Sequence, residues 1–149
     1  VSSVLEQDGD AYSYIVTGDA SAEFKIIEGG PGGQFSTSGT FESAIFDAGE
    51  SVAFNRIIPN FTQPTQTDIR FQVAAADAVS GSCSGAAYSF VGPDGTSSSY
   101  LEREETIPTS NDNNGFENPG QCFKFKAFFT TTDPVFSPTL YDVKINYSP

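Results

Sequence analysis

The sequence contains no histidine, tryptophan or methionine, and only two of its 149 residues are cysteines. Without histidine the chain lacks the usual general base and metal ligand, so a Ser-His-Asp site, a Cys-His site or a zinc site cannot be assembled. Carboxylates are the only acid–base groups left, and the run Glu102-Arg103-Glu104-Glu105 has the pattern of ordinary surface ion pairing. We therefore expect a protein that is not an enzyme.

Basic residues are also scarce, because 7 Lys and Arg stand against 19 Asp and Glu, which gives a formal net charge of −12. This charge disfavours binding to nucleic acid or to an anionic membrane surface. No apolar run approaches the ~20 residues that span a bilayer, and no signal-peptide pattern is visible. We expect no nucleic-acid partner, no direct membrane insertion by this segment, and any export signal or anchor to precede Val1.

The two cysteines, Cys83 and Cys122, are isolated in the chain and form no CxxC motif. An isolated pair in an acidic, Ser/Thr-rich chain favours a disulfide over a metal or redox site, and with it an extracellular or cell-surface location. Closing a loop of about 40 residues stabilises a fold by roughly 4 kcal/mol in the chain-entropy model. Two unpaired buried thiols are the alternative.

Helix signals are nearly absent, because clusters of Gly, Pro, Asn, Asp and Ser interrupt the chain throughout. Three segments show the strict apolar–polar alternation of half-buried strands: 68–75, 121–130 and 140–147. In the second of them, Lys124 and Lys126 are expected on a solvated face. Weaker strand patterns lie at 11–17, 23–28, 41–47, 51–59 and 87–91.

About eight strands at this spacing predict an all-β fold, namely a two-sheet antiparallel β-sandwich of jelly-roll type. Turn-forming clusters separate the strands, among them Asp47-Ala48-Gly49 and Gly92-Pro93-Asp94-Gly95. No linker divides the chain into two cores. We therefore expect a single β-sandwich domain over residues 1–149, in which residues 1–36 supply the less regular N-terminal strands.

Clusters of oxygen-bearing side chains make calcium the one metal that the sequence favours, because this ion takes six to eight hard oxygen ligands. The clusters do not match the EF-hand template, and a frayed terminus or a solvated loop is the alternative for each. The expected cofactor is therefore none, or a structural calcium ion. The candidate ligands are Asp8 and Asp10 in one cluster, and Asn111, Asp112, Asn113 and Glu117 in the other.

Aromatic residues are plentiful, with 14 Phe and 6 Tyr, and the strand alternation assigns most Phe to the core. Three rings lie in or near predicted loops, where an exposed ring could stack on a sugar or contact a partner: Tyr88, Tyr100 and Phe116. For these three, core filling is the favoured role and ligand binding the alternative.

Four stretches carry a likeness to known proteins: 37–49 (TSGTFESAIFDAG), 67–73 (TDIRFQV), 90–96 (FVGPDGT) and 123–147. In this order they resemble the β-sandwich heads of prepilin-like and other bacterial surface proteins, which are similar to galactose-binding-like, discoidin-type jelly rolls. The resemblance covers about residues 37–147 and consists of strand and turn patterns rather than catalytic motifs.

The resemblance implies a non-enzymatic extracellular head domain of a pilin-like surface filament or of an adhesin, with a structural or attachment role. Its partners would be other filament or surface subunits. The alternative function is a carbohydrate-binding module, with or without calcium, whose partner would be a glycan.

Overall fold

The structure is a computed structural model that describes residues 2–4, 14–16, 27–28, 34–109 and 115–149. Near the N-terminus it contains a three-stranded antiparallel sheet in the order β1-β2-β3. The weak strand patterns at 11–17 and 23–28 contain two of its strands. The bounds are β1 (Ser2–Val4), β2 (Tyr14–Val16) and β3 (Ile27–Glu28).

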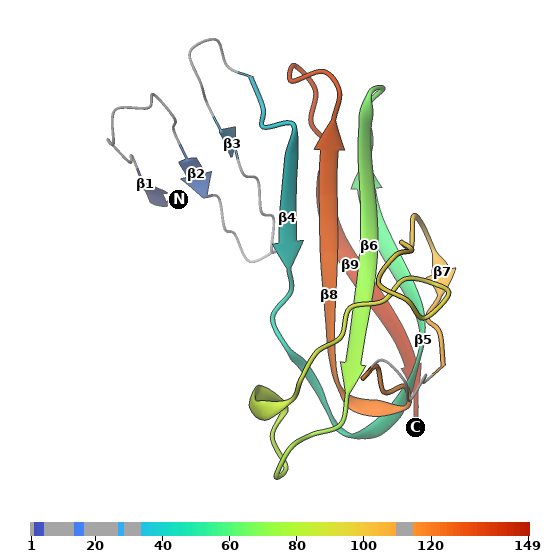
Figure 1. The fold of residues 1–149 in the computed structure, drawn as a ribbon. Coiled ribbons are helices and arrows are strands. Elements are labelled where there is room, and N and C mark those ends of the chain that lie inside the picture. Colours follow the sequence, from blue (N-terminus) through green and yellow to red (C-terminus); the bar gives the residue numbers. More distant parts are fainter. Residues whose placement is uncertain (1, 5–13, 17–26, 29–33, 110–114) are drawn as a thin grey trace. The chain divides into compact units, whose positions relative to one another are not determined.

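A second, six-stranded antiparallel sheet contains the remaining strands (Figure 1). Its central order is β4-β8-β5-β7, while β6 also pairs with β8 and β9 also pairs with β5. The described part of the chain has no α-helix, and the all-β class predicted from the sequence is confirmed. The bounds are β4 (Ser38–Glu42), β5 (Phe46–Thr62), β6 (Thr67–Ala76), β7 (Glu105–Thr106), β8 (Gly120–Thr131) and β9 (Thr139–Ser148).

The three segments with strict alternation each coincide with a strand, namely β6, β8 and β9. The strand predicted at 87–91 is wrong, because this segment forms only an isolated bridge, between Val91 and Val73 of β6. A short 3₁₀ helix, η1 (Cys83–Gly85), precedes it.

The turn predicted at Asp47-Ala48-Gly49 is also wrong, because these residues lie inside the long strand β5. Gly49 has a φ of +80°, and its N–H donates to the Asp47 carboxylate at 2.8 Å. The pairing of β5 with β8 shifts register between Asp47 and Val52. Glycine tolerates this backbone conformation, so the chain carries an irregularity within the ladder instead of reversing direction.

The chain divides into two compact units, and several strands contribute residues to both. The first unit comprises Val1–Gly39, Pro59–Ile69 and Phe128–Val143, and the second comprises Thr40–Ile58, Arg70–Ala127 and Lys144–Pro149.

In the first unit, the turn between β5 and β6 is hydrogen-bonded to the residues that end β8. The Gln66 carbonyl accepts the Thr132 N–H at 2.9 Å and the Thr131 hydroxyl at 3.3 Å. The Thr131 N–H in turn donates to the Thr37 carbonyl at 2.9 Å. These bonds satisfy backbone carbonyls that the turns would otherwise leave unpaired.

The second unit contains most of the apolar core. Phe54 of β5 and Phe123 of β8 have ring centroids 4.7 Å apart and are almost completely buried. Burial of each such ring contributes roughly 1.5–3 kcal/mol. Other large apolar side chains buried in this unit include Val52, Ile57, Phe71, Val73, Val91, Leu101, Ile107 and Phe116.

A buried amide links this core to the loops beside it. Asn118 is 4% exposed; its side-chain oxygen accepts the Phe54 N–H at 2.9 Å, and its side-chain NH₂ donates to the Phe54 carbonyl at 2.8 Å. The same NH₂ donates to the Pro108 carbonyl at 2.7 Å. One side chain therefore satisfies three backbone groups near β5.

We predict that Asn118→Ala lowers the free energy of unfolding by about 3 kcal/mol, because it leaves these buried backbone groups without partners. Urea denaturation measures the effect. Asn55→Ala is the matched control, because the side chain of Asn55, an exposed asparagine of β5, donates only to the Ser148 hydroxyl among the described residues. This variant should change stability by no more than about 0.5 kcal/mol. Equal losses in the two variants would contradict this role of Asn118.

Candidate functional site

The long connection between β6 and β7, residues 77–104, is the most elaborate feature of the second unit, and we call it the pinned connection. Cys83 of η1 and Cys122 of β8 lie at disulfide distance, with their sulfur atoms 2.00 Å apart, so neither cysteine is free. Ala76 is buried with them, and Ala78, Ala86 and Tyr88 pack against this small cluster. The cysteine pairing expected from the sequence is therefore present.

The pinned connection follows β6 beyond the disulfide (Figure 1). Phe71 exchanges two backbone hydrogen bonds with Leu101, at 2.7 and 2.9 Å, and Val73 exchanges two with Val91, at 2.9 and 2.8 Å. The buried Gln72 side chain donates to two further backbone carbonyls of the connection. An irregular segment is thus held to the sheet at points spread along its length.

The tip of the pinned connection is the turn expected from the sequence at residues 92–95. The Asp94 carboxylate accepts hydrogen bonds from the Ser99 hydroxyl and from the Thr96 N–H and hydroxyl, and these bonds hold its pKa below the usual range. A Cβ atom on Gly92 would lie 2.3 Å from the Ser99 backbone, so only glycine fits there. The Asp94 carboxylate is therefore engaged by neighbouring residues of the pinned connection.

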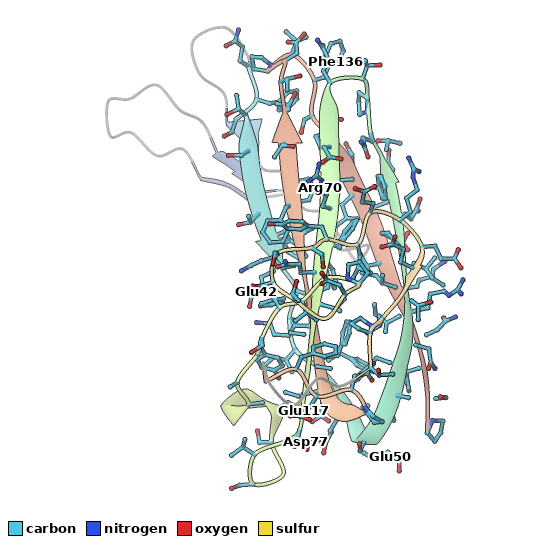
Figure 2. The ribbon with its side chains drawn as sticks, turned by 45° about the vertical axis from the view of Figure 1, so that its right-hand side comes forward. Glu42, Glu50, Arg70, Asp77, Glu117 and Phe136 are labelled. Atoms are coloured by element: carbon cyan, nitrogen blue, oxygen red, sulfur yellow. A yellow bond between two sulfur atoms is a disulfide. The ribbon has the colours of Figure 1, made fainter. Side chains whose placement is uncertain are left out.

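Two lysines of β8 form a charged cluster with Glu42 of β4. Lys124 donates to one Glu42 carboxylate oxygen, and Lys126 lies 3.3 Å from the other. Each ammonium also lies over a ring of the pinned connection, Lys124 at 5.3 Å from the Tyr88 centroid and Lys126 at 4.8 Å from the Phe90 centroid. Figure 2 labels Glu42 at the end of β4.

The prediction that Lys124 and Lys126 lie on a solvated face of β8 is wrong. The Lys124 and Lys126 side chains are only 16% and 29% exposed, because the pinned connection covers them. Hydrogen bonding to Lys124 lowers the pKa of Glu42, against the opposing effect of burial. Burial, followed by the charge of Asp47, raises the pKa of Tyr88.

The three rings considered for ligand binding have different environments. Phe116 is 0% exposed, so the alternative of a surface ring that contacts a ligand is wrong for it, and it fills the core. Tyr88 is half-buried, and its hydroxyl donates to the Cys83 carbonyl at 2.9 Å. Tyr100 is also half-buried, with the Arg70 guanidinium 5.9 Å from its ring centroid.

Most of the candidate calcium ligands lie outside the described residues: Asp8, Asp10, Asn111, Asp112 and Asn113. Glu117 is described; it is half-buried, and its N–H donates to the Ala75 carbonyl at 2.9 Å. Figure 2 shows it toward the same end of β6 as Asp77. The described residues contain no group of three acidic or cysteine side chains that could hold a metal, and structural calcium stays a prediction.

A cavity of about 360 Å³ lies beside the Asn118 amide. Its walls include β5 residues 53–56, Thr106, Ile107 and Pro119. The Asn118 polar atoms are already used by Phe54 and Pro108, and in the described part of the chain no buried side-chain nitrogen or oxygen lacks a hydrogen bond. The cavity therefore offers no unpaired buried side-chain group to orient a ligand.

Comparisons of the chain with protein-family models, with curated proteins and with solved structures find no match. In the residues that the structure describes, no helix is long and apolar enough to cross a bilayer.

We predict that replacing both cysteines with alanine lowers the free energy of unfolding by about 4 kcal/mol, because the bond closes a loop over a sequence separation of 39 residues. The variant should also be cleaved by proteinase K first within the pinned connection, as mapped by mass spectrometry. Titration of the unfolded wild type without reductant should detect no free thiol. Two free thiols, or an unchanged stability of the variant, would contradict a structural role for the bond.

The charged cluster predicts a small acid dependence of stability. The pKa of Glu42 is lower in the folded protein than in the unfolded chain, so its contribution is complete above a pH of about 4.3 and is lost as pH falls through the folded value. Glu42→Gln should remove this dependence and cost less than about 1 kcal/mol at pH 7, because Glu42 is partly exposed. Urea denaturation between pH 3 and 7 tests this.

Glu50→Gln is the control for this experiment, because Glu50 is an exposed carboxylate of the same unit with no ion pair in the described residues. The pH profile of Glu42→Gln should differ from that of the wild type, whereas the profile of Glu50→Gln should follow it. Identical profiles for all three proteins would contradict a contribution of the charged cluster.

Proposed function

We propose that the chain is a non-enzymatic extracellular head domain of a surface filament or adhesin, built as a single β-sandwich of jelly-roll type over residues 1–149. The observation that carries the proposal is the pinned connection, an irregular segment fixed to the sheet by a disulfide, backbone bonds and buried side chains. Such a segment presents a fixed surface without a catalytic cleft, which suits attachment or subunit contact.

The branching of the six-stranded sheet supports the two-sheet part of the proposal. Strand β8 pairs with β4, β5 and β6, and strand β5 pairs with β7, β8 and β9, so both strands change partners along their length. In sandwiches, strands that pass from one layer to the other do so at bulges or bends, and the register shift of β5 is such an irregularity. The buried contact between Phe54 and Phe123 is consistent with two facing layers.

Three carboxylates have structural roles, which is consistent with the proposed non-enzymatic domain. The pKa values of Glu42, Asp47 and Asp94 are all lowered, in each case first by a side-chain hydrogen bond. A carboxyl group that serves as a general acid needs a raised pKa, so these three groups have the opposite property. Their hydrogen bonds instead hold strands and turns together.

The cysteine pair and the net charge support the proposed extracellular location. A disulfide that closes a long loop persists in oxidising compartments, outside the reducing cytosol. A net charge of −12 keeps a surface domain soluble at high local density.

We predict that antibodies raised against this chain label intact cells that express the full-length protein, as observed by immunogold electron microscopy. Label on filaments or in a surface layer is the expected result, and antibodies against a cytosolic protein serve as the control for intact envelopes. Label that appears only after permeabilisation would overturn the proposed location.

A glycan array separates attachment by protein contact from the carbohydrate-binding alternative. We expect no specific glycan to bind. Binding that is lost in Tyr100→Ala but kept in Tyr141→Ala, an exposed tyrosine of β9 and thus outside the pinned connection, would replace the proposal with a carbohydrate-binding module.

A further inference from the structure

Strand β9 has a free edge in the described part of the chain. Its neighbour in the sheet is β5, and no backbone group of β9 bonds to any other described segment. Backbone groups of an antiparallel strand point alternately to its two sides, so a row of N–H and C=O groups of β9 faces away from β5. An edge strand of this length is a template for a further strand.

The side chains on one face of β9 form an apolar strip that is only partly covered. Val143 and Ile145 are half-buried, while Tyr141 and Tyr147 are 39% and 49% exposed. The Tyr147 ring lies 6.1 Å from the ring of the buried Phe54, so Tyr147 borders the core of the second unit. A strand added beside β9 would extend the sheet and cover the exposed parts of the strip.

The opposite face of β9 carries Asp142 and Lys144, two positions apart. Both are exposed. Asp142 accepts one hydrogen bond from the Asn60 side chain at 2.8 Å through a single carboxylate oxygen, and Lys144 makes no ion pair within the described residues. Each residue therefore retains charge that a neighbouring strand could match.

We propose that β9 pairs antiparallel with β9 of a second copy of this chain, with Val143 opposite its own counterpart. In this register Asp142 of each copy lies opposite Lys144 of the other, which gives two ion pairs. On the apolar face, Tyr141 lies opposite Ile145 of the partner. The pairing is two-fold symmetric, and each copy presents the same surface.

Charge favours this pairing register over the two adjacent registers. A shift by one residue would place apolar side chains on the polar face, so allowed registers differ in steps of two. Centring the pair on Asp142 would set two carboxylates opposite each other, and centring it on Lys144 would set two ammonium groups opposite each other. The same lysine that discourages unspecific edge pairing thus favours one specific partner.

The proposal is independent of the proposed function, because pairing of β9 requires neither export nor a ligand. It is tested first with a single new cysteine. Val143→Cys places two thiols opposite each other, at a Cα separation of about 4.5–5.5 Å that a disulfide spans, so mild oxidation should give a covalent dimer on non-reducing gels. Peptide mapping verifies that Cys83 and Cys122 stay linked to each other.

Asn146→Cys is the matched control. In the proposed register its two copies are six positions apart, about 20 Å along the strand, so this variant should stay monomeric on the gel. Equal crosslinking of Val143→Cys and Asn146→Cys, or none in either at about 100 μM protein, would overturn the proposal.

A charge exchange provides an independent test. Lys144→Asp and Asp142→Lys each set like charges opposite each other, so each alone should weaken dimerisation at least about tenfold in sedimentation experiments. Mixing the two variants restores both opposite-charge pairs, and native mass spectrometry should then show the mixed dimer in excess over either homodimer. Circular dichroism verifies that each variant is folded. A mixture with no excess of mixed dimer would overturn the register.

Discussion

Burial of β8 on both faces is the constraint on which the second unit depends. Phe123 packs against Phe54 in the core, while Cys122 and Lys124 on the other face are covered by the pinned connection. Covering the strand in this way removes part of the water around each ammonium group, so each group needs some compensating interaction. Glu42 and the two aromatic rings supply it, and the connection can therefore lie against a cationic strand without an unmatched charge.

Much of the sheet could be predicted from the sequence, because apolar and polar residues alternate strictly in β6, β8 and β9. Such alternation is the local pattern of a strand with one buried face. The cysteine pairing could be predicted as well, since two isolated cysteines have only one possible intramolecular partner each. Both inferences rest on local pattern or simple counting, and neither requires knowledge of how distant segments meet.

The remaining features depend on distant segments and left no local pattern. Lys124 and Lys126 alternate as a solvated face would, and only the arrival of a segment more than 30 residues away covers them. Phe116 lies in a polar, turn-rich stretch, yet its ring is in the core. Gly49 belongs to a sequence that favours a turn, yet it lies within β5, because pairing with β8 outweighs the local turn propensity. The ion pairs between side chains of β4 and β8 likewise cannot be predicted from the periodicity of the sequence.

The position of β8 in the chain has a consequence for how the protein reaches its folded state. This strand pairs with β4, β5 and β6, all of which precede it, and it carries the second cysteine. During synthesis the pairs that these strands make with β8 therefore cannot form, and Cys83 lacks its partner, until β8 emerges. Long-range pairing of this kind is slow and exposes strand edges to aggregation. Mutual repulsion within a chain of net charge −12 reduces that hazard, so the acidic composition serves the nascent chain as much as the finished domain.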